Sequence, residues 1–288
     1  MSYLWYILIV ISIYAVLACS LNLVAGYVGA VSMCHAAFYG IGAYVTTLLM
    51  LKAGFGFLPA MGLAIPFTAA LSLLIGVPSL RLHGDYFVLA TLGFQTIVFS
   101  ILYNWVDLTR GPHGIPGIPV PQILGFKFDS VFLYFLFSAT LAAASLGGIW
   151  LLVHSPFGRL LRAVRDDEVA AASLGKNVPR VKATAFAIGA AFAAVPGALF
   201  AGYMRYIDPT SFTLTESIFI LSIVVIGGAG SFFGPIVGAA FMVILPEALR
   251  FLQVPDSLAA NLRQIIYGLL LVALMRLRPQ GFFGEYRF

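Results

Sequence analysis

The stretch LWYILIVISIYAVLACSLNLVA, residues 4–25, contains no charged side chain. An α-helix rises about 1.5 Å per residue, so about 20 apolar residues cross the roughly 30 Å hydrocarbon core of a bilayer. The stretch therefore predicts a transmembrane helix close to the N-terminus. It lacks the basic region that opens a secretory signal, so we expect this helix to be retained.

The composition of the whole chain also indicates a protein surrounded by lipid. Of its 288 residues, 61% are hydrophobic and only 9% are charged, and the mean hydropathy is +1.01. A soluble domain has about 45–50% apolar and about 25% charged residues. Disorder is excluded as well, because it requires low hydrophobicity and high net charge. We expect an all-α, polytopic transmembrane helix bundle, formed by a single transmembrane domain over residues 1–288.

Eight further stretches have the composition of membrane spans. They lie at 31–51, 59–80, 86–104, 131–153, 183–203, 215–229, 234–250 and 262–276. The total is about nine spans, within a range of eight to ten, because some stretches are short and Pro or Gly interrupts others. Asp85 precedes one of these stretches and is expected to cap that helix at its N-terminus.

Two polar intervals set the expected topology. The interval 105–130 holds four Gly and four Pro, which predicts an irregular loop outside the bilayer. The interval 154–182 holds six of the sixteen Lys and Arg residues, and basic loops mark the cytoplasmic side. Counting spans from there puts the C-terminus in the cytoplasm, and it puts 105–130 and the N-terminus outside. We expect a multi-pass protein of the inner (plasma) membrane.

A charged helix is predicted within the basic interval, over FGRLLRAVRDDEVAAASLG, residues 157–175. Pro156 suits its start and Gly175 suits the position just past its end. Arg162 and Asp166 are four residues apart and are expected to pair along its surface. The helix is too charged to span a membrane. It is a docking surface for a cytoplasmic partner, a solvated loop or a lipid-headgroup binder, and the acidic run at 166–168 argues against the lipid.

Five motifs, in order along the chain, resemble one known family. They are RLHGDYFVLATL at 81–92, TRGPHGI at 109–115, RAVRDDEVA at 162–170 with GKNV at 175–178, GGAGSFFGPIVGA at 227–239 and RPQGFFG at 278–284. Together they look like the permeases of branched-chain amino-acid ABC importers, the LivH/LivM family, and most closely its LivM branch. The resemblance covers residues from about 22 to 284.

This resemblance implies a type II-like importer permease that forms half of a translocation pathway for leucine, isoleucine and valine. Its partners would be a second homologous permease subunit, two cytoplasmic ABC ATPase subunits and an extracytoplasmic solute-binding protein, besides membrane lipid. The resemblance also implies a cytoplasmic coupling helix whose ATPase-coupling residues are Arg159, Arg162, Arg165, Asp166, Asp167, Glu168 and Gly175. Related permeases carry urea and other small amides, so the solute stays open.

Other functional classes lack the residues that they need. The single Gly-Lys pair, Gly175-Lys176, is not part of a Walker A loop, so ATP hydrolysis is expected in separate chains. Two cysteines and four histidines are scattered along the chain, so no metal, cofactor or catalytic constellation is indicated, and nothing indicates nucleic acid. An ion-coupled secondary transporter remains an alternative, with only Glu216 and Glu247 as intramembrane acids.

The remaining candidate residues fall into three groups. Polar residues at membrane depth either line the translocation path or form interhelical hydrogen bonds, as Asn22 also can, and the path candidates are Ser32, His35, Thr91, Gln95 and Glu216. Charged residues in the outer loops either contact the binding protein or are solvated, namely Arg110, Arg205 and Asp208. Small residues at four-residue spacing predict close helix packing, at Gly189, Ala193 and Gly197 and at Gly230, Gly234 and Gly238.

Overall fold

The structure, a computed structural model, describes residues 2–79, 84–123 and 126–250, together with 268–269, 272, 276 and 280–283. Helices dominate the described residues, so the expected all-α class is confirmed. They are α1 (Ser2–Ala25), α2 (His35–Lys52), α3 (Phe57–Ser79), α4 (Asp85–Asn104), α5 (Val106–Thr109), α6 (Val131–His154), α7 (Pro156–Asp166), α8 (Glu168–Ser173), α9 (Val178–Met204), α10 (Leu214–Gly227) and α11 (Phe233–Arg250). Two 3-10 turns, η1 (Gly111–His113) and η2 (Pro209–Phe212), and the strands β1 (Ile115–Pro116), β2 (Gln122–Ile123), β3 (Phe126–Lys127) and β4 (Tyr206–Ile207) complete the order.

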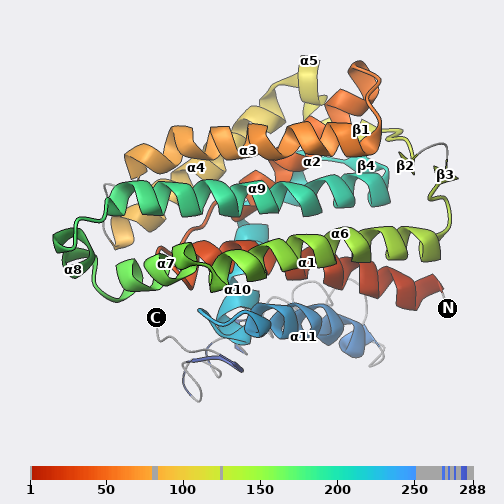
Figure 1. Ribbon diagram of the computed structural model, residues 1–288. Helices are drawn as coiled ribbons and strands as arrows, with labels where there is room; N and C mark the ends of the chain where they lie inside the picture. Colours follow the sequence, from red (N-terminus) through yellow and green to blue (C-terminus); the bar gives the residue numbers. More distant parts are fainter. Residues whose placement is uncertain are drawn as a thin grey trace.

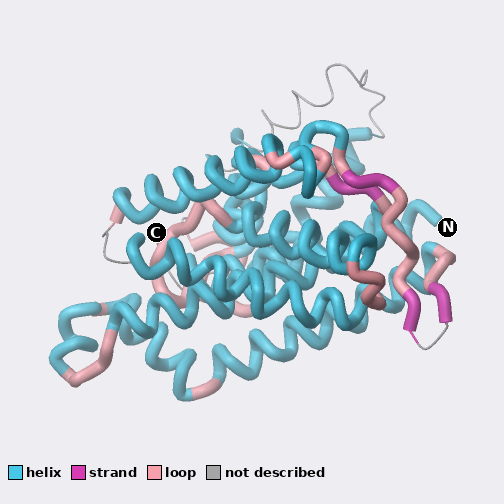
Figure 2. The backbone as a smooth tube through the Cα atoms, turned by 90° about the horizontal axis from the view of Figure 1, so that it is seen from above, coloured by secondary structure: helices cyan, strands magenta, loops and turns pink. Residues whose placement is uncertain are grey.

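The long helices α1, α3, α6 and α9 run along one axis and give the molecule two ends (Figure 1). One end carries the short helices α7 and α8. The opposite end carries the start of α1 and the short strands, which Figure 2 shows from above. Ring packing agrees, because Trp5 of α1 lies 4.9 Å, between ring centroids, from Phe132 at the start of α6. We call the two ends the α8 end and the strand end.

The strands attach the irregular interval 105–130 to the helix bundle. β1 pairs antiparallel with β4, which places Ile115 opposite Ile207 just after α9. β2 and β3 form a second antiparallel pair, with Gln122 opposite Lys127. The interval is therefore held against the strand end by a segment that lies about 90 residues further along the sequence.

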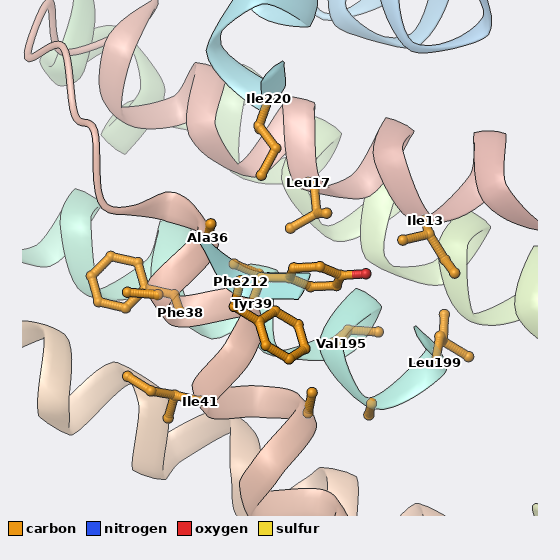
Figure 3. Packing of buried hydrophobic residues seen from close by; sticks show 14 of the residues in the cluster. Ile13, Leu17, Ala36, Phe38, Tyr39, Ile41, Val195, Leu199, Phe212 and Ile220 are labelled. Carbon is orange, nitrogen blue, oxygen red and sulfur yellow. The ribbon is translucent and has the colours of Figure 1, made fainter. Parts of the chain in front are cut away.

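Helix α2 lies at the centre of the bundle. It packs against α9 and α3 and also touches α4, α10 and η2. Figure 3 shows Tyr39 of α2 among side chains that come from other elements, including Leu17, Leu199 and Phe212. The rings of Tyr39 and Phe212 are 5.0 Å apart between centroids. A helix surrounded by protein in this way must be apolar or small around its whole circumference.

Small residues permit the closest helix contacts. A Cβ on Gly197 of α9 would lie 2.2 Å from the carbonyl oxygen of Tyr39, and one on Gly42 of α2 would lie 2.5 Å from the Cα of Ala194. Gly189 faces the carbonyl oxygen of Ser20 in α1. The expected small-residue stripe of α9, which includes the buried Ala193, therefore lies against α2 along one part and against α1 along another. Gly234 and Gly238 approach the α10 carbonyl oxygens of Gly227 and Ile223 in the same way.

The number of membrane spans differs from the expected nine. Five helical runs in the described residues are long and apolar enough to cross a bilayer, namely Tyr3–Ala25, Phe57–Leu74, Asp85–Asn104, Val131–His154 and Val178–Met204. Helices α10 and α11 are apolar but shorter, and α2 is sheltered by other helices. The expected span 262–276 falls largely outside the described residues. Nine spans are therefore not confirmed.

Several expected boundaries were wrong for local reasons. The predicted span 31–51 begins as a helix only at His35, and residues 31–34 lead into it without helical structure. Helix α9 begins five residues before the expected 183, because the Asn177 side chain accepts a hydrogen bond from the backbone N–H of Arg180. Asp85 is not the N-cap of α4. Gly84, at φ +58°, takes that position, and Asp85 lies in the first turn, where a negative charge favours the helix dipole.

Candidate functional site

The charged segment at the α8 end forms two helices rather than the single one expected. Ser155 caps α7 by accepting from the backbone N–H groups of Phe157 and Gly158. Helix α7 ends at Asp166, because Asp167 adopts an extended conformation and its carboxylate accepts from the N–H groups of Val169 and Ala170, each at 2.9 Å. The Asp167 side chain thus starts the second helix, α8, and changes the direction of the chain.

Two of the three arginines of α7 point into the protein. Arg165 donates to the carbonyl oxygen of Gly26, at 3.1 Å, and to the carboxylate of Asp166, at 3.0 Å. Arg162 donates to the carbonyl oxygen of Val153, at 3.2 Å, so the expected pair with Asp166 does not form. Only Arg159 is exposed. The arginines therefore do not share one solvent-facing surface: two of them brace α7 against the ends of α1 and α6.

Helix α8 is braced in a different way. Its first residue, Glu168, forms an ion pair with Lys182 of α9. Lys182 is only 8% exposed. The sequence alone indicates no partner for Lys182. A basic residue where a loop meets a span is expected to be solvated. Gly175 adopts φ +76° in open space, which turns the chain back toward α9.

Two apolar residues, one in α8 and one just after it, contact little of the chain. Val169 is 80% exposed and Leu174 is 79% exposed, beside the exposed Asp167. The sequence reasoning concentrated on charges and missed both residues. A signal was present, because Val169 and Leu174 are the two branched apolar residues of 165–177, where the other residues are charged, polar or small. The described residues therefore leave both apolar side chains open to water or to another molecule.

A buried polar cluster surrounds the start of α2. The Gln95 side chain oxygen accepts from the backbone N–H of Ala37, at 2.8 Å, and from the Ser217 hydroxyl, at 3.1 Å, and its amide donates to the carbonyl oxygen of Phe212, at 2.7 Å. Ser217 also accepts from the N–H of Ala36. The first N–H groups of a helix have no partner within it, so side chains from α4 and α10 cap α2.

Three other predicted path residues lie beside this cluster. Thr91 accepts from the N–H of Met33, at 3.1 Å. His35 is 2.7 Å from the Ser20 hydroxyl, and the Ser32 hydroxyl contacts the thiol of Cys34. The structure thus brings Thr91 and Gln95 of α4 together with Ser32 and His35. Every one of these side chains is buried and hydrogen-bonded.

Glu216 does not join the other path candidates. Its carboxylate accepts from the Tyr14 hydroxyl, at 2.6 Å, which links the start of α10 to α1. Glu247 forms a hydrogen bond with Tyr3, also in α1. The two candidate intramembrane acids, Glu216 and Glu247, are therefore each paired with a tyrosine of the first helix.

The three predicted binding-protein contacts lie at the strand end. Arg110 and Arg205 are exposed and both adopt positive φ, at 59° and 56°. Arg205 lies 3.6 Å from the carboxylate of Asp129. Asp208 instead accepts from the backbone N–H and the hydroxyl of Ser211 and shapes the η2 turn. Within the described residues, no group of His, Cys, Asp and Glu is arranged to hold a metal ion.

Known proteins of one family are similar to this chain over most of its length. The sequence profile described as "branched-chain amino acid transport system / permease component" matches residues 3–275. The high-affinity branched-chain amino acid transport system permease protein LivM of Salmonella typhimurium is 38% identical over 292 residues, which cover 93% of this chain and 67% of the relative. A probable LivM of Methanocaldococcus jannaschii is 26% identical, covering 97% and 92%, and the permease protein LivH of Escherichia coli K12 is 26% identical, covering 95% and 92%.

No solved structure matches the chain at a significant level. The profile match nevertheless spans almost all of the chain, and the 38% identity extends over 93% of it. The chain therefore belongs to the family of permease components of branched-chain amino acid transport systems.

Proposed function

We propose that this chain is one permease subunit of an ATP-binding-cassette importer and forms half of the translocation pathway for leucine, isoleucine and valine. Family membership supports the solute class, because the LivM relative is named for high-affinity transport of branched-chain amino acids. The similarity to LivH supports a second, homologous permease as partner. Two ATPase subunits and an extracytoplasmic binding protein complete the proposed assembly, and this chain carries out no covalent chemistry.

The observation that carries the coupling part of the proposal is the exposed pair Val169 and Leu174 on a braced helix. The α8 end is assigned to the cytoplasm because its connecting segment holds six of the sixteen Lys and Arg residues. An ATPase groove that covered the two side chains would remove them from water. Hydrophobic burial of this kind is the main favourable term in protein association.

The braces provide a route from α8 to the membrane-spanning helices. Glu168 connects α8 to α9 through Lys182, and Arg165 connects α7 to the end of α1 at Gly26. Helix α7 also follows directly from α6. A displacement of α8 by the ATPase therefore pulls on three long helices at once, which is a rigid-body movement of the kind that opens and closes transport proteins.

At the strand end, Arg110, Arg205 and Asp208 are the proposed contacts for the binding protein. Figure 1 supports their separation from the coupling surface, because the elements that carry them lie at the end opposite α8. The proposed path runs between these two ends and passes the polar cluster at Gln95 and Thr91. Since Gln95 accepts from Ala37 of α2 and from Ser217 of α10, and Thr91 accepts from Met33 just before α2, they face the solute only in a conformation that separates α2 from α4 and α10.

The test uses the assembled transporter in proteoliposomes, with ATP inside and the binding protein and labelled leucine outside. Val169→Asp and Leu174→Asp place a charge in the proposed apolar contact. We expect each to reduce leucine uptake and leucine-stimulated ATP hydrolysis about tenfold or more, the effect of losing one interface anchor. Val106→Asp places the same charge at a residue that is 53% exposed in α5, and it should leave ATP hydrolysis measured without the binding protein unchanged.

Three results would contradict the proposal. Normal ATP-dependent uptake by both α8 variants would remove the coupling role of α8. Leucine uptake by the chain alone, driven by a proton or sodium gradient, would favour the secondary transporter. Competition by urea, but not by isoleucine or valine, would reject the proposed solute class.

A further inference from the structure

A cavity of about 390 Å³ lies at the α8 end. Its walls come from the turn after α1, the last residues of α6, helix α7, the loop that leads into α11 and Phe283 near the C-terminus. Neither the proposed docking of α8 nor the polar cluster near α2 uses this cavity. Its contents must therefore be inferred from its own chemistry.

The cavity has a basic lining. Arg162 of α7 and His154 at the end of α6 both contribute to it, and none of its described lining residues is Asp or Glu. The guanidinium of Arg162 also lies 5.6 Å from the centre of the Tyr27 ring, another wall residue. A basic pocket without a carboxylate favours an anionic ligand.

Arg162 has an unused donor. Its Nη2 donates to the carbonyl oxygen of Val153, at 3.2 Å, but its Nε is buried and has no hydrogen-bond partner among the described residues. Buried donors in proteins are normally paired. The Arg162 side chain is part of the cavity wall, so an oxygen bound there meets the guanidinium donors that the bond to Val153 does not use.

His154 offers a second contact. Its Nδ1 lies 2.8 Å from the carbonyl oxygen of Trp150. A carbonyl oxygen only accepts, so Nδ1 carries the proton of this bond, and Nε2 donates to a ligand oxygen when the ring carries a second proton. The start of α11 adds a positive potential, because Ser231 and Phe233 at its N-terminus line the cavity and a helix N-terminus attracts anions.

The rim of the cavity is apolar and aromatic. Trp150 is 43% exposed, Phe233 is 65% exposed and the neighbouring Leu151 is 65% exposed. Exposed apolar residues at the end of a membrane-spanning helix face lipid, and tryptophan is enriched where acyl chains meet headgroups. A soluble anion makes no use of such a rim, whereas a lipid uses both the cationic interior and the apolar edge.

We propose that this cavity binds the phosphate group of an anionic phospholipid headgroup. Arg162 donates to the phosphate oxygens, His154 Nε2 and the N-terminus of α11 lie beside them, and the acyl chains extend along Trp150, Leu151 and Phe233. The lipid thereby fills the space between α6, α7 and α11. This assignment gives Arg162 a role distinct from that of Arg159, three residues earlier on the same helix.

The test measures lipid binding to the purified full-length chain in detergent. Phosphatidylglycerol is titrated, with native mass spectrometry to count bound lipids and thermal unfolding to measure stabilisation, and diacylglycerol serves as the lipid without a phosphate. We expect one tightly bound phosphatidylglycerol per chain and no comparable binding of diacylglycerol. Arg162→Gln removes a charge-assisted hydrogen bond and should weaken the binding about tenfold. Arg159→Gln, which removes one exposed charge, should leave it within about twofold.

Arg162→Lys separates binding from folding, since lysine keeps the charge but loses the planar fork of donors. It should bind phosphatidylglycerol several-fold less tightly than the unaltered chain while unfolding at the same temperature without lipid. Equal weakening by Arg159→Gln and Arg162→Gln would show a general attraction to basic surface and overturn the proposal. Undiminished binding by both Arg162 variants would overturn it too, and so would displacement of the lipid by inorganic phosphate, which would identify a site for a free anion.

Discussion

Asn22 joins two parts of the chain that are more than 200 residues apart. Its side chain oxygen accepts from the backbone N–H of Gly230, at 2.9 Å, and its amide donates to the carbonyl oxygen of Ser231, at 2.7 Å. A Cβ on Gly26 would lie 2.0 Å from the same side chain. One buried amide thus holds the glycine-rich loop before α11 against the end of α1. The Asn22 side chain therefore forms hydrogen bonds between a helix and a loop, with Gly230 and Ser231 as its partners.

The first prediction concerns this residue. Asn22→Ala leaves a buried N–H and a buried carbonyl without partners, each of which costs about 1–3 kcal/mol. We expect the melting temperature of the detergent-solubilised protein to fall clearly. Asn104→Ala, at an exposed position whose amide bonds only within its own helix, is the matched control. A fall of the same size in both variants would show that the link to Gly230 contributes nothing particular.

Gln95 gives a second prediction at the same scale. Gln95→Met keeps the length of the side chain but loses three hydrogen bonds, including the cap on Ala37 and the donor to Phe212. We expect a loss of stability of about 2 kcal/mol or more, because buried backbone groups are left unpaired. Thr96→Val, at the next residue, removes only a bond within α4 and should change the melting temperature little. Equal melting temperatures for Gln95→Met and the unaltered chain would refute the capping role.

At the scale of elements, the close approach of α2 and α9 determines how the bundle packs. The contact depends on Gly197 and Gly42, where a side chain would meet backbone atoms of the facing helix. Backbone cannot move aside as a flexible side chain can, so these positions demand glycine. Helices in a membrane gain most from such close contact, because the lipid offers no hydrophobic driving force between them.

The third prediction follows from this contact. Gly197→Ala adds a methyl group 2.2 Å from the Tyr39 carbonyl oxygen and should destabilise the protein by about 1–3 kcal/mol through overpacking. Gly147→Ala, in α6, has no atom within 4 Å of the new Cβ. It should be neutral or stabilising by up to about 1 kcal/mol, since alanine is the better helix former. The comparison uses the melting temperatures of the two purified variants, and the opposite order would show that α2 and α9 do not pack this closely.

At the scale of the whole molecule, the two ends carry different structural elements. The α8 end carries the braced and exposed α7–α8 segment, and the strand end carries the paired strands with Arg110 and Arg205. The N-terminus lies at the strand end, as Figure 1 shows. Counting spans predicts that the N-terminus and the interval 105–130 lie on the side opposite the segment 154–182, and the two ends are arranged in this way. The side of the membrane that each end faces is a proposal.

The fourth prediction tests that proposal. Lys176→Cys lies in the α8-end loop and Lys127→Cys lies at the strand end, both at exposed positions. A membrane-impermeant maleimide should label Lys127→Cys in intact cells and Lys176→Cys only in inverted vesicles. The native Cys19 and Cys34 are buried, so the unaltered chain should remain unlabelled and serve as the control. Labelling of Lys176→Cys from outside intact cells would reverse the assigned orientation.

The sequence by itself determined the membrane environment, the all-α class, the position of the charged segment and the family resemblance. These properties follow from local composition and from motifs of a few residues, such as RAVRDDEVA at 162–170. It also pointed to Thr91 and Gln95 as polar residues of note, since few polar groups occur in a span without a partner or a function.

Only the tertiary structure decided how such residues are used. It turned Arg162 and Arg165 inward, left Val169 and Leu174 exposed and made Gln95 a cap for α2. Their partners lie far away in the sequence: Gly26 is 139 residues from Arg165, and Ser217 is 122 residues from Gln95. Local periodicity reports which face of a helix is apolar, but it contains no information on which distant backbone group needs a hydrogen bond, and that need is set only when the helices pack.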